Sequence, residues 1–64
     1  MSLFDVRIWE KTEAAAGEGE MVFTLESIFA KNKIRACTEA MNFYREFFEI
    51  EKGNVLTATA RVVR

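Results

Sequence analysis

This 64-residue chain contains no histidine and a single cysteine, Cys37. One thiol without histidine cannot complete the four-ligand set of a closed zinc site. A lone cysteine also has no disulfide partner within the chain, and an unpaired thiol suits a reducing compartment. Small proteins usually add a disulfide, a metal or a second subunit to a thin core. We therefore expect a bound partner or self-association, with a homodimer favoured.

Long apolar runs and an excess of charge of one sign are also missing. Nine basic residues nearly balance ten acidic ones, so the net charge does not favour binding to nucleic acid or to an anionic membrane. No stretch approaches the roughly 20 apolar residues that span a bilayer, and no signal peptide precedes the first strand-like segment. These features predict a cytoplasmic protein without a membrane partner.

Motifs for catalysis or cofactor binding are absent as well. Gly17 and Gly19 precede a strand-like segment rather than a helix, so they indicate a turn and not a phosphate-binding loop. Cys37 falls on the apolar stripe of an expected helix, and the chain offers no histidine as its base. Tyr44 shares that stripe. We expect a non-enzymatic protein that binds no cofactor.

The chain does contain a change in the spacing of its apolar residues. They recur every two residues, then about every three and a half residues, and then every two residues again. A strand is expected at residues 3–11, with Phe4, Val6 and Ile8 facing the core. Residues 12–20, rich in alanine, glycine and glutamate, predict a flexible hairpin loop. A second strand follows at residues 21–30, with Met21, Phe23 and Leu25 inward and Val22 and Ile28 outward.

The helical period begins after Asn32, a favourable N-cap, and extends for about four turns. Its apolar residues recur every three or four positions, at Ile34, Cys37, Met41, Tyr44 and Phe48, with Ala36, Ala40, Phe43 and Phe47 alongside. Gly53 predicts a break. The last strand is expected at residues 55–63, where Ala58 and Ala60 leave room for bulky helix residues such as Tyr44 and Phe47.

These elements predict one α+β domain over residues 1–64. A short hairpin and a right-handed crossover place the first strand between the other two, in the order 2-1-3, within a three-stranded antiparallel sheet. One helix covers one face of this sheet. The other face is left open, with Leu3, Trp9, Val22, Ile28, Val55, Thr57, Thr59 and Val63 among Asp5, Arg7, Lys11, Glu26 and Arg61.

The open face and the edge of the last strand are candidate protein-binding surfaces. Trp9 is a residue type enriched at binding hot spots, and Val55 to Ala60 contains no charge, proline or glycine to discourage strand pairing. Two copies paired at this edge would form a six-stranded sheet. The simpler alternative is that neither surface binds a partner, because the exposed apolar residues are scattered singly and Arg61 and Arg64 discourage pairing at the edge. The predicted partner-binding residues are Arg7, Trp9, Val55, Thr57, Thr59, Arg61 and Arg64.

The expected helix carries its charges against its own dipole. Lys31, Lys33 and Arg35 lie at its start, whereas Glu46, Glu49 and Glu51 lie near its end. A basic helix N-terminus can hold a phosphate or a carboxylate, which makes these three basic residues a candidate anion site and offers nucleic-acid binding as an alternative function. A charged, solvated helix end is the other interpretation.

The segments FDVRIWE, MVFTLESIFA, ACTEAMNFYREFF and GNVLTATARVVR, in this order, cover nearly the whole chain. Their pattern resembles the small bacteriophage proteins that inhibit host enzymes, notably the podophage-type inhibitor of bacterial RNA polymerase. In that family, arginines on the last strand contact the polymerase, and the best-matching positions here are Arg61 and Arg64. The resemblance implies a non-enzymatic inhibitor or adaptor that binds a host protein in the cytoplasm of the host cell.

Overall fold

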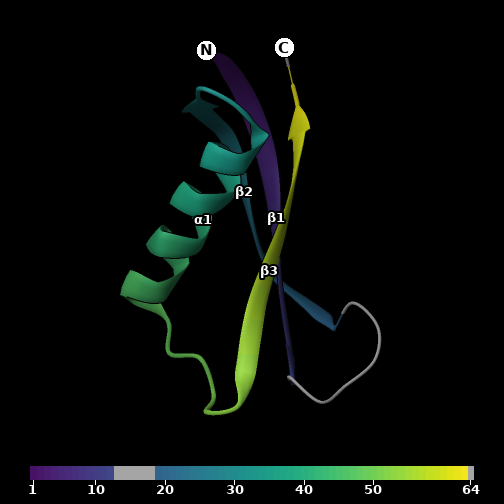
Figure 1. Ribbon diagram of the computed structural model, residues 1–64, viewed down its shortest axis with the longest axis vertical. Helices are drawn as coiled ribbons and strands as arrows, with labels where there is room; N and C mark the ends of the chain where they lie inside the picture. The colour runs from purple at the N-terminus through teal and green to yellow at the C-terminus, as the bar shows by residue number, and fades with distance from the viewer. Residues whose placement is uncertain (13–18, 64) are drawn as a thin grey trace.

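The computed structural model describes residues 1–12 and 19–63, which form three strands and one helix (Figure 1). The elements are β1 (Ser2–Thr12), β2 (Glu20–Ala30), α1 (Lys33–Phe47) and β3 (Asn54–Val62). Both neighbours of β1 run antiparallel to it, in the order β2-β1-β3. The predicted α+β fold and strand order are confirmed. The predicted hairpin loop lies mostly outside the described residues, but Thr12 and Glu20 belong to the strands.

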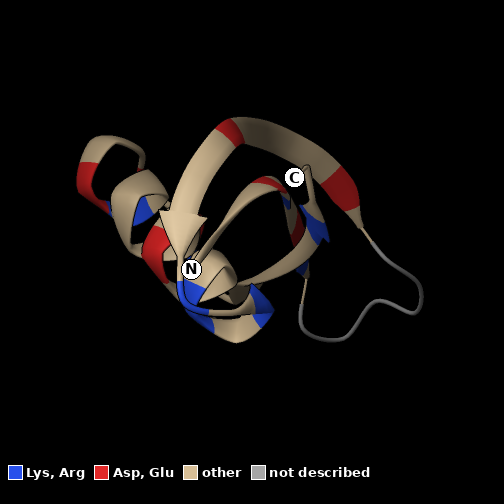
Figure 2. Cartoon of the chain, turned by 90° about the horizontal axis from the view of Figure 1, so that it is seen from above, with Lys and Arg blue, Asp and Glu red and all other residues tan. Residues whose placement is uncertain are grey.

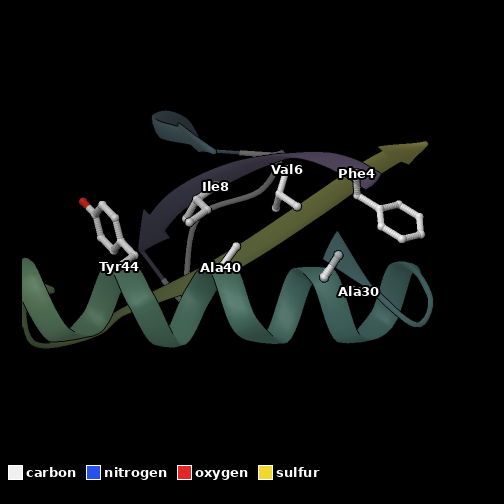
Figure 3. Close-up of a cluster of buried hydrophobic side chains, with 7 residues drawn as sticks. Phe4, Val6, Ile8, Ala30, Ala40 and Tyr44 are labelled. Atoms are coloured by element: carbon white, nitrogen blue, oxygen red, sulfur yellow. The ribbon is translucent and has the colours of Figure 1, made fainter. Parts of the chain in front are cut away.

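The core lies between the central strand and α1, as the alternation of β1 predicts. Phe4, Val6 and Ile8 are almost completely buried and project toward the helix (Figure 3). Opposite them lie Ala36, Ala40 and Tyr44 of α1, and Ala30 at the end of β2 completes the group. Because alanine has a small side chain, the helix backbone can approach the sheet closely, and β1 supplies most of the bulk.

The buried stripe of α1 differs from the predicted one. It is centred on Ala36, Ala40 and Tyr44, whereas Ile34, the first residue of the predicted stripe, is 78% exposed. Spacing alone cannot distinguish a stripe of large residues from a neighbouring stripe of alanines. The alanines face the sheet because Phe4 and Ile8 of the central strand already fill the space between the sheet and the helix.

The ends of α1 are fixed by its own backbone and cap. The side chain of Asn32 accepts a hydrogen bond from the Arg35 N–H (2.9 Å), which confirms the predicted N-cap. The helix ends at Phe47, before the predicted break at Gly53. Gly53 instead adopts a φ of 91°, in a turn closed by the Asn54 N–H donating to the Glu51 carbonyl (3.0 Å). It therefore directs the chain into β3.

Two bulges in β2 change which of its residues face the core. Between the pairs Phe4–Ile28 and Val6–Leu25, β2 contains one more residue than β1, and the same holds between Ile8–Phe23 and Trp9–Met21. Each extra residue resets the two-residue alternation. As a result the expectations for three residues of β2 are wrong: Ile28 and Val22 pack against the core, and Met21 is 47% exposed.

Candidate functional site

The face of the sheet opposite α1 brings most of the predicted partner-binding residues together. Trp9 pairs with Thr57, Arg7 with Thr59, Lys11 with Val55 and Asp5 with Arg61 across β1 and β3. Paired residues of an antiparallel sheet point to the same side, and these alternate with the buried residues of β1. Arg64 lies outside the described residues.

A shallow hollow of about 240 Å³ occupies the middle of this face. Its polar lining comes from all three strands: Asp5 and Arg7 of β1, Thr24 and Glu26 of β2, and Thr59 and Arg61 of β3. From the sequence, apolar and charged residues were expected to be mixed across this face. In the structure Asp5, Arg7, Glu26 and Arg61 line the hollow, whereas the apolar Leu3 and Trp9 lie toward its ends.

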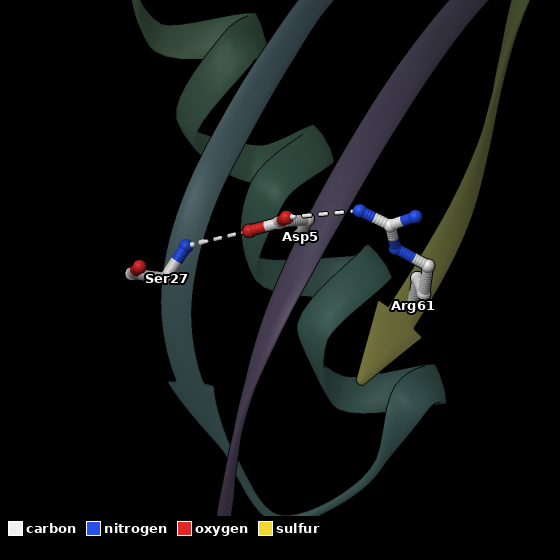
Figure 4. A network of polar contacts seen from close by, with 3 residues as sticks. All are labelled: Asp5, Ser27 and Arg61. Carbon is white, nitrogen blue, oxygen red and sulfur yellow. Dashed lines mark hydrogen bonds and ion pairs between the residues drawn. The ribbon is translucent and has the colours of Figure 1, made fainter. Parts of the chain in front are cut away.

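Asp5 organises the polar centre (Figure 4). One carboxylate oxygen accepts a hydrogen bond from the Ser27 N–H (Oδ1, 3.1 Å), and the other lies 3.6 Å from Nη2 of Arg61. Asp5 therefore connects both edge strands to the central strand. Arg61 remains largely exposed despite this ion pair, so its guanidinium retains free donors that can bind a carboxylate of a partner.

Apolar residues lie at both ends of the hollow. At one end Trp9 is half-buried and pairs with Met21. At the other end Leu3 pairs with Phe29, whose side chain is 59% exposed. Phe29 and Met21 were not expected on this face, because neither bulge of β2 contains a glycine that would indicate it in the sequence.

The edge of β3 remains a second candidate. β3 pairs with β1 along one side, and no other described strand pairs with its second side. Thr57 and Thr59 are exposed, and Val55 is half-buried. An extended segment of a partner could add to this edge through main-chain hydrogen bonds.

The basic start of α1 is only partly assembled. Lys31 and Arg35 line one hollow together with Asn32, but Lys33 is not part of this lining and Glu39 is. The Asn32 side chain already accepts the Arg35 N–H, so one of the free amide donors that could bind an anion is occupied. The acidic Glu39 further weakens this hollow as an anion site.

An aromatic cluster at the end of α1 was not anticipated. Phe23 of β2 contacts Phe43, Tyr44 and Phe48, with ring centroids 5.5 to 6.4 Å apart, and Phe47 lies 4.8 Å from Phe43. Tyr44 alone is buried; Phe43, Phe47 and Phe48 are 41%, 64% and 45% exposed. The expectation that Phe47 and Phe48 would pack inward is therefore wrong. We call these five residues the aromatic cluster.

Cys37 is half-buried on α1, and burial raises the pKa of its thiol. A raised pKa lowers the fraction of reactive thiolate at neutral pH. Among the described residues, no three potential ligands of the histidine, cysteine or carboxylate type lie together as a metal site. The helix of the described chain is not long and apolar enough to cross a membrane.

The fold and this surface define a class: a small α+β protein with a three-stranded antiparallel sheet covered by one helix on one face. In comparisons with known proteins, no family model, curated protein or solved structure matches the chain. The functional argument therefore depends on the chain's own residues.

Proposed function

We propose that this chain is a small non-enzymatic module that binds a partner protein through the open face of its sheet. The observation that carries the proposal is the arrangement of this face, which has a charged hollow at its centre. Trp9 and Met21 lie at one end of the hollow, and Leu3 and Phe29 lie at the other end. Apolar anchors beside hydrogen-bonding groups are the usual anatomy of a protein interface.

The proposed contacts follow from the chemistry of the face. Trp9 supplies the apolar anchor, because large aromatic residues at an interface bury much area at little entropic cost. Arg7 and Arg61 bind carboxylates or carbonyls of the partner. Thr57 and Thr59, with Val55, present the β3 edge to an extended segment of the partner.

The proposed partner is a bacterial host protein, and the resemblance to phage inhibitors makes RNA polymerase the first candidate. A role as inhibitor or adaptor requires only binding. This agrees with a sequence that offers no evident pair of catalytic acid and base residues, and with the raised pKa of Cys37, which makes its thiol less reactive. The reducing cytoplasm of a bacterial host suits the unpaired thiol.

A capture experiment tests this proposal. The wild-type chain, Trp9→Ala and Arg61→Glu are immobilised and exposed to a bacterial lysate, and retained proteins are identified and then titrated in purified form. Asn42→Ala, an exposed change on α1, serves as the matched control. We expect the control to retain the same protein as wild type and the two face variants to lose it with unchanged circular dichroism.

Purified bacterial RNA polymerase is titrated in the same way. Binding that Trp9→Ala weakens at least tenfold supports polymerase as the partner. The open-face proposal is wrong if every protein that wild type retains is retained equally by both face variants. Binding to nucleic acid that weakens steeply with salt and is lost in Lys31→Glu would instead favour the alternative function at the basic start of α1.

A further inference from the structure

The charges at the two ends of α1 are unfavourable in an isolated copy of the chain. Lys31, Lys33 and Arg35 surround the positive end of the helix dipole, and Glu46, Glu49 and Glu51 surround its negative end (Figure 2). All six residues are exposed. None of them forms an ion pair with another residue in the described part of the chain.

Each charged end also exposes apolar side chains. Ile34 lies between Lys33 and Arg35 in the sequence, with most of its surface in water. The aromatic cluster lies among the acidic residues, since Glu46 precedes Phe47 and Glu49 follows Phe48. The chain thus presents an apolar residue in a basic surrounding and an apolar cluster in a surrounding that is acidic on balance, because Glu46, Glu49 and Glu51 outnumber Arg45 and Lys52.

We propose that a second copy of this chain covers α1, with the two helices antiparallel. Ile34 and the basic residues of each copy then contact Phe48, the member of the aromatic cluster nearest this flank, and the acidic residues of the other. Ile34 and Met41 are spaced by seven residues and therefore lie on one flank of the helix, and Phe48, seven residues further on, is the C-cap that directly follows its last residue. A pair centred on Met41 places Ile34 of one copy opposite Phe48 of the other.

The length of the helix explains why a single copy cannot satisfy these charges. A helix of 15 residues is about 22 Å long, which exceeds the screening length of about 8 Å at physiological ionic strength. Its two ends therefore do not neutralise each other. In an antiparallel pair, the basic end of each helix lies beside the acidic end of the other, and the assembly closes as a two-fold dimer. A parallel pair would place like charges together.

This dimer uses the side of the molecule opposite the proposed partner-binding face, so it stands independently of the proposed function. It also differs from the dimer expected from the sequence, in which two β3 edges pair. Pairing at β3 would leave the charged ends of α1, Ile34 and Phe48 uncovered.

Complementary charge reversal tests the proposal. Lys33→Glu and Glu49→Lys each place like charges against each other in a homodimer, but a mixture of the two variants restores both contacts. Each reversal also agrees better with the helix dipole, so the variants should fold at least as well as wild type. Mass in solution is measured by analytical ultracentrifugation, for each variant alone and for an equimolar mixture.

We expect wild type to be a dimer and each variant alone to dimerise about tenfold or more weakly, because each substitution acts twice in a two-fold interface. The mixture should recover dimers of wild-type affinity. Arg7→Glu and Glu26→Lys, which change the net charge equally on the open face, serve as matched controls and should dimerise like wild type. Ile34→Ala, at an exposed position of the proposed contact, should also lose the dimer while keeping the circular dichroism of the fold.

Three results would overturn the proposal. One is a wild-type chain that stays monomeric at millimolar concentration. Another is a dimer that both charge variants keep but that Thr57→Lys abolishes, since this places the contact at the β3 edge. The third is a mixture that associates no better than its components.

Discussion

At the scale of single residues, Ser27 holds a left-handed backbone conformation, with a φ of 58°, inside β2. Such a conformation costs a non-glycine residue of order 1–3 kcal/mol and persists only when its surroundings enforce it. Here the Ser27 N–H donates to the Asp5 carboxylate, which also contacts Arg61. The strained residue therefore belongs to the polar centre of the open face and fixes the position of the bulge.

Substitution of Ser27 should reveal this strain. We expect Ser27→Val to lower the free energy of unfolding by about 1–2 kcal/mol, because a β-branched side chain fits the left-handed region poorly. Ser27→Gly should be neutral or stabilising by up to about 1 kcal/mol. Both variants keep the N–H that binds Asp5. Urea unfolding followed by the fluorescence of Trp9, the only tryptophan, measures the difference, and equal stability of the two variants would contradict the prediction.

The thiol of Cys37 predicts a dependence of stability on alkaline pH. Burial raises its pKa in the folded chain, so the folded state binds more protons than the unfolded state between the two pKa values. The free energy of unfolding is then unaffected below the pKa of the unfolded thiol, about 8.5, and falls as pH rises through the folded value. Urea unfolding between about pH 7 and 9.5 should show this decline in wild type and a smaller one in Cys37→Ala. Identical slopes would assign the decline to other groups.

At the scale of the elements, the alanines of α1 set the distance between helix and sheet. Ala36 and Ala40 are completely or almost completely buried against the core. A larger side chain at either position must push the helix away from β1, with loss of contact along its whole length. The small size of these two side chains therefore sets the position of the helix.

Ala40→Leu should destabilise the fold by about 1–3 kcal/mol through overpacking. Thr38→Leu, at an exposed position of the same helix, adds similar bulk and should change stability by less than about 0.5 kcal/mol. Thermal unfolding followed by circular dichroism compares the two. A helix that tolerates leucine equally at both positions would show that the alanine contact is loose.

The elements also show what the sequence could and could not predict. Alternation located the three strands, and the helical period with Asn32 located the start of α1. The bulges of β2 could not be predicted, because neither contains a glycine and Ser27 occupies a conformation usually left to glycine. The bulge next to Ser27 turns Ile28 toward the core, and the bulge at Val22 turns Met21 away from it. Spacing also could not show that Ala36 and Ala40, rather than Ile34, face the sheet, so the aromatic cluster was missed.

At the scale of the whole molecule, the chain has more apolar surface than its core can cover. The buried residues of the described chain include several alanines, whereas Phe29, Ile34 and Phe47 lie mostly in water. A chain of this length buries only about 60% of the surface of its unfolded form. We therefore expect stability to rise when the exposed apolar residues are covered, on the open face by the proposed partner and at α1 by the proposed second copy.

This dependence predicts that the stability of the chain varies with its concentration. If a folded dimer unfolds to two free chains, each tenfold rise in protein concentration adds about 1.4 kcal/mol per mole of dimer to the free energy of unfolding. The urea midpoint of wild type should therefore rise steadily over a hundredfold range of concentration, whereas that of Lys33→Glu should stay constant where this variant is monomeric. Equimolar Lys33→Glu and Glu49→Lys should restore the rise. A wild-type midpoint that does not change with concentration would show that the folded chain is stable without a second copy.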